Sequence, residues 1–110
     1  MLDKEAHKNI KNMRECMTEI WGNDVEITYF KEFDYPFSQF EMKVKIENKY
    51  DVLITYDRSI MGIAVNINGK FEWIDDLSSK EVIGSFDSCR TKENMLYNFK
   101  ILEEVLKELK

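Results

Sequence analysis

The stretch Phe40-Glu41-Met42-Lys43-Val44-Lys45-Ile46-Glu47 alternates strictly between apolar and charged side chains. Successive side chains of a β-strand point to opposite faces of the sheet, so this stretch predicts a strand with one buried face. Apolar groups also alternate in residues 25–29 before it and in residues 51–56, 60–67 and 70–74 after it. Only short connections separate the last four segments, which leaves no room for crossover helices. The sequence therefore predicts a five-stranded antiparallel meander.

The turns decide which residues pair, and paired residues share a face of the sheet. At Asn68-Gly69, a two-residue turn would pair Val65 with Glu72, whereas a bulge at Gly69 would pair Val65 with Trp73. We choose the bulge because it brings apolar groups together. The other expected pairs are Ile46 with Val52, Val44 with Ile54, Tyr56 with Met61, and Ile54 with Ile63. The expected buried face consists of Phe40, Met42, Val44, Ile46, Val52, Ile54, Tyr56, Met61, Ile63, Val65, Ile67, Phe71 and Trp73.

Helices are predicted at both ends of the chain. Apolar residues recur every three or four positions between residues 2 and 20 and again between residues 95 and 109, which is the helical period. Asp3 is a candidate N-cap for the first helix, and Ser88 or Thr91 for the last. Residues 75–88 are ambiguous between a short helix and a sixth strand, and we favour a helical turn.

One apolar sheet face and two amphipathic helices predict an α+β fold, a two-layer sandwich with both helices on the same face. The 110 residues are expected to form a single domain with one core. The other sheet face is expected to stay open, polar at its edges and lined by small residues at its centre. The open positions are Glu41, Lys43, Lys45, Asp51, Leu53, Thr55, Gly62, Ala64, Asn66 and Glu72.

The composition excludes several classes of function. The net charge is −5, and the acidic excess lies between residues 24 and 90, so the chain is expected to repel nucleic acid and to favour basic partners. No apolar run is long enough to span a membrane, and the first residues lack the pattern of a secretion signal, so a cytoplasmic location is expected.

No catalytic or metal-binding constellation stands out. The two cysteines, Cys16 and Cys89, lie far apart in sequence, and His7 is the only histidine, so a typical zinc site cannot be assembled. Cys89 lies beside Arg90 near the start of the predicted last helix, which would favour a thiolate, although a buried, unreactive thiol is the commoner case. We expect no enzyme activity, no metal and no cofactor.

The most distinctive segment is aromatic and acidic. Between Tyr29 and Phe40 there are six aromatic residues, interleaved with acidic ones. In a strand, Tyr29 would face inward and Phe30 outward. Aromatic side chains beside acidic groups are typical contacts for a basic protein surface, although the segment could instead fold as a lid over the core. The candidate partner-binding residues are Phe30, Glu32, Asp34, Tyr35, Phe37 and Glu41.

In size and charge the chain resembles anti-CRISPR and toxin-immunity proteins, a resemblance of format that carries no motif. We therefore expect a non-enzymatic inhibitor that occludes a basic, nucleic-acid-handling partner such as a nuclease or a nucleic-acid-guided effector. The alternative is a small-molecule module or weak enzyme, with a pocket between helices and sheet lined by Met17, Tyr56, Met61 and Trp73. A third interpretation is a homodimer formed through the open sheet face.

Overall fold

The computed structural model describes residues 2–33 and 38–109. Helix α1 (Lys4–Trp21) comes first, and the strands β1 (Val25–Phe33), β2 (Gln39–Ile46), β3 (Tyr50–Asp57), β4 (Ile60–Ile67) and β5 (Lys70–Trp73) follow. A single turn of helix, α2 (Ile74–Leu77), and a 3-10 helix, η1 (Ser85–Cys89), lead into α3 (Lys92–Glu108). The five strands form one antiparallel sheet in sequence order, which confirms the predicted meander and the α+β class.

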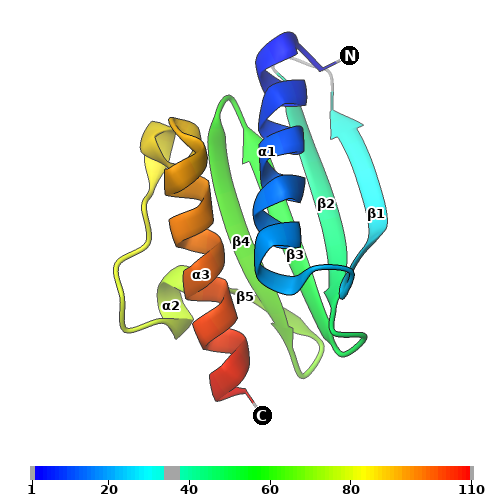
Figure 1. The fold of residues 1–110 in the computed structure, drawn as a ribbon, viewed down its shortest axis with the longest axis vertical. Helices are drawn as coiled ribbons and strands as arrows, with labels where there is room; N and C mark the ends of the chain where they lie inside the picture. Colours follow the sequence, from blue (N-terminus) through cyan, green and yellow to red (C-terminus); the bar gives the residue numbers. More distant parts are fainter. Residues whose placement is uncertain (1, 34–37, 110) are drawn as a thin grey trace.

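Both long helices cover the same face of the sheet (Figure 1). Helix α1 lies over β2 and β3, α3 lies over β4 and β5, and the two run in the same direction side by side. The helices begin at predicted caps. The Asp3 carboxylate accepts from the amide of Ala6, and the Thr91 hydroxyl accepts from the amide of Asn94. In the described residues, no helix has the length and apolar character that a membrane span needs.

The strands bury the face that strict alternation predicted, with two exceptions at the sheet's last strand. Residues 40–46 alternate between buried and half-buried side chains, as do residues 52–57. The pairs Tyr56 with Met61 and Ile54 with Ile63 form as expected. The β2–β3 hairpin is tighter than expected, since Val44 pairs with Val52 and Ile46 with Tyr50, but the shift of two leaves every side chain on its predicted face.

The β4–β5 hairpin has the other register from the one we expected. Val65 pairs with Glu72, and Asn68 and Gly69 both have positive φ, as a two-residue turn requires. The Asn66 side chain accepts from the amide of Gly69 and supports this turn. The backbone preference of Asn-Gly therefore outweighs apolar matching, and Phe71 and Trp73 lie on the open face instead of in the core.

The segment between β5 and α3 contains no strand and no helix over residues 78–84. Backbone groups of Ile83 are held at 2.9 Å by the buried amide of Asn98, which donates to the carbonyl and accepts from the N–H. The Ser88 hydroxyl accepts from the amide of Met61 at 2.9 Å and fixes η1 against β4. Two side-chain anchors thus place Cys89 and the start of α3.

Candidate functional site

The predicted partner-binding residues do not form one patch. Glu41 lies on the open face, opposite Lys31 and Thr55. Phe30 and Glu32 lie on the helix side of β1, where the ring of Phe30 stacks on Phe40 at 5.3 Å between centroids. Asp34, Tyr35 and Phe37 are outside the described residues.

A bulge in β1 explains the side that Phe30 takes. The pairing with β2 shifts between Ile27 and Tyr29, and one extra residue is accommodated there. The shift reverses the faces of the strand beyond it, so Tyr29 points to the open face and Phe30 to the helix side. The expectation that Tyr29 faces inward and Phe30 outward is therefore wrong.

The open face carries an apolar and aromatic row that crosses all five strands. Register partners in this row are Tyr29, Lys43, Leu53, Ala64 and Trp73, one from each strand. The Lys43 ammonium lies 5.1 Å from the ring centroid of Tyr29 and 5.7 Å from that of Phe71, so it spans two rings by cation–π contacts. We call Tyr29, Lys43, Leu53, Phe71 and Trp73 the aromatic row.

The indole of Trp73 packs closely over β4 because Gly62 carries no side chain there. A Cβ atom added to Gly62 would come within 2.9 Å of the indole and within 2.7 Å of the Thr55 hydroxyl. Ala64, the register partner of Trp73, is only 1% exposed although it lies on the open face. Trp73 itself is 43% exposed, so the indole contacts the sheet and solvent at the same time.

Charges surround the aromatic row in compensating pairs and end in an acidic stretch. Lys45 lies 3.8 Å from Asp51, and Lys31 is paired in register with Glu41. At the Trp73 end the balance changes, because Asp75 and Asp76 follow directly in α2 and are exposed. Asp75 and Asp76 are thus acidic residues close to Trp73 in sequence, on a helical turn that contacts α3.

The predicted small-molecule pocket is not assembled. Tyr56 and Met61 are buried in the core, where Tyr56 stacks on Phe40 at 4.8 Å and its hydroxyl accepts from the amide of Asn9 at 3.0 Å. Met17 is a buried residue of α1 and faces the core, whereas Trp73 lies on the opposite face of the sheet. The placement of Trp73 in this pocket followed from the wrong β4–β5 register.

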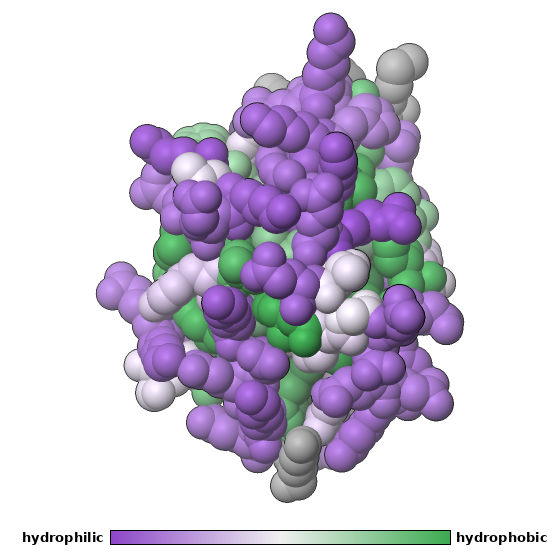
Figure 2. Space-filling model, in the orientation of Figure 1, coloured by the Kyte–Doolittle hydropathy of each residue, from purple (hydrophilic) through white to green (hydrophobic). Residues whose placement is uncertain are grey.

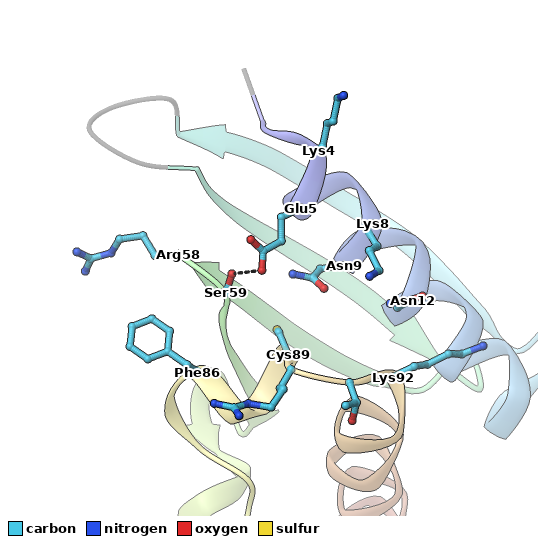
Figure 3. A pocket seen from close by; sticks show the side chains of 12 residues that line it. Lys4, Glu5, Lys8, Asn9, Asn12, Arg58, Ser59, Phe86, Cys89 and Lys92 are labelled. Carbon is cyan, nitrogen blue, oxygen red and sulfur yellow. Dashed lines mark hydrogen bonds between the residues drawn. The ribbon is translucent and has the colours of Figure 1, made fainter.

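A cavity of about 860 Å³ opens at a different place, where the N-terminal half of α1 meets the β3–β4 turn, η1 and the first residues of α3 (Figure 3). Its lining brings together Lys4, Glu5, Lys8, Asn9, Asn12, Arg58, Ser59, Phe86, Cys89, Arg90, Thr91 and Lys92. The Ser59 hydroxyl donates to the Glu5 carboxylate at 2.8 Å across one side of the hollow. Sequence reasoning missed this cavity, because its walls come from segments far apart along the chain.

Cys89 is a neutral thiol in the floor of this cavity. It is buried, and burial raises its pKa to about 11, with a small opposing effect from the Ser88 hydroxyl. The thiolate favoured by its position beside Arg90 therefore does not form near neutral pH. Neither cysteine is in a disulfide, and no group of three metal-ligating side chains occurs in residues 2–33 and 38–109.

Comparisons with known proteins give no relative. No protein family, no curated protein and no solved structure matches the chain.

Proposed function

We propose that this chain is a non-enzymatic binding protein that docks a basic segment of a partner protein on the open face of its sheet. The observation that carries the proposal is Trp73, whose indole packs over Gly62 while 43% of the residue stays exposed. A fixed aromatic ring of this kind loses little freedom on binding, and tryptophan is among the residues most enriched at binding hot spots.

The aromatic row supports an interface of useful size. Tyr29 is 39% exposed, Leu53 and Phe71 are half-buried, and the row crosses the full width of the sheet. An exposed apolar stripe with a polar rim is typical of protein-binding surfaces. The helix side of the molecule also shows hydrophobic surface, between the helices and over β1, within a largely hydrophilic surface (Figure 2).

The charge of the partner follows from the ring faces and the rim. Lys43 already lies against the faces of Tyr29 and Phe71, so the row accepts cations on its rings. Tryptophan is the strongest cation–π acceptor, and the acidic pair Asp75 and Asp76 follows it directly. An arginine or lysine side chain stacked on Trp73 would gain from both, and the net charge of −5 would speed its approach.

The partner class we propose is a basic, nucleic-acid-handling protein whose groove the chain occludes, as anti-CRISPR and immunity proteins do. The segment between β1 and β2 was also predicted to contribute, through Asp34, Tyr35 and Phe37, and remains part of the proposal. The open sheet face could serve a homodimer instead, and the experiment distinguishes the two.

The test starts with the tagged chain, co-purification from its native host and identification of the bound protein, and then measures affinity by calorimetry. Trp73→Ala should weaken the complex at least about tenfold, as expected for a hot-spot residue. The control is Tyr97→Ala, which removes an equally exposed aromatic residue from α3 on the other side of the molecule.

Two results would contradict the proposal. The first is a partner whose contact surface is acidic, or equal changes in the affinity of the complex for Trp73→Ala and Tyr97→Ala. The other comes from light scattering on the purified chain. A dimer that Trp73→Ala dissociates would assign the face to a second copy of this chain.

A further inference from the structure

The cavity between α1, the β3–β4 turn, η1 and α3 is rich in basic side chains, although the protein as a whole is acidic. Five of its lining residues are cations (Lys4, Lys8, Arg58, Arg90 and Lys92), and Glu5 is the only carboxylate. The chain as a whole has an acidic excess of five. We infer that this cavity binds a nucleotide, with phosphates among the basic side chains and the base on Phe86.

The five cations of the lining fall into two groups, those without an acidic partner among the described residues and those in exposed ion pairs. Lys4 and Lys8 lie one turn apart on α1, and no acidic partner is recorded for either in the described residues. The other three cations are each paired at the surface, Arg58 with Asp57, Arg90 with Asp87 and Lys92 with Glu15, all at 2.9 Å. Exposed pairs of this kind contribute little to stability, so their cations can turn toward a phosphate without disturbing the fold.

The thiol and the amide in the floor of the cavity carry no charge near neutral pH. Cys89 keeps its proton, because burial raises its pKa. Asn9 is 3% exposed and is fixed through its hydrogen bond to Tyr56. Thr91 caps α3, so the positive end of this seventeen-residue helix also faces the cavity. The Glu5 carboxylate is the only acidic group of the lining itself, and it lies between Ser59 and Asn9 in the middle of the hollow (Figure 3). A ligand phosphate would therefore have to approach from the side of the basic groups.

Phe86 points to a ligand with a ring. It is 61% exposed, more than any other large apolar side chain in the described residues, and it stands at the rim of the cavity near the basic groups. Aromatic side chains at such positions stack on bases, and the cavity volume falls in the range of small-ligand sites. Phosphate alone would not need this ring.

The test uses calorimetry on the full chain with ATP and, separately, with tripolyphosphate, both in EDTA so that no cation bridges to acidic groups. Lys8→Gln should weaken both ligands about tenfold, the loss expected for one charge-assisted contact. Lys11→Gln, on the same helix but outside the cavity, should change either affinity less than about twofold. Glu5→Gln should tighten both.

Phe86→Ala separates the base from the phosphates. It should weaken ATP about fivefold or more, within the range measured for stacking, and leave tripolyphosphate unchanged. The inference is overturned if ATP does not bind at millimolar concentration, if Lys8→Gln and Lys11→Gln have equal effects, or if Phe86→Ala leaves ATP unaffected. Binding of a single-stranded oligonucleotide without a response to ATP would also overturn it.

Discussion

Both faces of β4 are buried at the centre of the strand, one by the helix layer and the other by a few side chains of the neighbouring strands. Ile63, on the helix side, is buried beneath elements anchored by many side chains. Ala64, on the open side, is equally buried, but its register neighbours are only Leu53 and Trp73. We therefore expect the covered face to carry most of the stability of the fold, and the open face is the one we propose for partner binding.

The largest expected effect removes a bulky side chain from the covered face. Phe99→Ala deletes a fully buried ring between α3 and the sheet and should lower the free energy of unfolding by about 3–5 kcal/mol. Urea denaturation followed by circular dichroism measures this loss. Trp73→Ala, on the open face, should cost much less, and equal losses would show that the two faces share the stability of the fold.

A second test titrates the thiol that η1 buries on the covered side. Because burial raises the pKa of Cys89 to about 11, the folded state keeps this proton after the unfolded chain has released it. Stability therefore falls as pH rises from about 9 to about 11, by about 2 kcal/mol from this group. Denaturation midpoints of the wild type should drop across that range more steeply than those of Cys89→Ala, and parallel curves would contradict the assignment.

A third test crowds the open face. Gly62→Ala places a methyl group against Thr55 and the indole, and it should cost about 1–2 kcal/mol while moving Trp73 off the strand. In a Trp21→Phe background, the emission of Trp73 should shift to longer wavelength. Gly84→Ala is the matched control, since nothing lies within 4 Å of a Cβ added there. Identical stability and emission for the two variants would mean that the indole does not rest on Gly62.

The smallest expected effect compares two tyrosines of the covered face. The Tyr50 hydroxyl is buried without a hydrogen-bond partner, whereas that of Tyr56 accepts from Asn9. Tyr50→Phe should leave stability unchanged or raise it by up to about 1 kcal/mol, and Tyr56→Phe should lower it by about 1 kcal/mol. Thermal melts of the two variants check the sign of each change, and a clear loss for Tyr50→Phe would contradict the first expectation.

The sequence predicted the fold where local pattern and tertiary packing agree. Residues 40–46 alternate without a break, so the face of β2 was determined, and β3 followed through its pairing. The prediction failed at Asn68-Gly69, because we weighted apolar pairing above the backbone conformation that this dipeptide prefers. Recognising that preference would have placed Trp73 on the open face.

The candidate sites were harder to predict, because they depend on register and on contacts between distant segments. The β1 bulge reverses Tyr29 and Phe30, and alternation within residues 25–29 gives no sign of it. The basic cavity joins Lys8 on α1 to Arg90 before α3, a proximity that helical periodicity alone does not define. The one sequence signal for this cavity was Phe86, an aromatic residue in a polar stretch, which could have indicated an exposed ring at a binding site.

The β1 bulge also has a consequence for how the molecule behaves among its own copies. β1 is a nine-residue edge strand, and a regular strand of that length would offer its outer backbone groups as a template for fibril growth. The shift between Ile27 and Tyr29 breaks the even spacing of those groups, so an incoming strand cannot stay in register along the whole edge. One inserted residue thus disfavours edge-to-edge pairing of copies along the longest strand of the sheet.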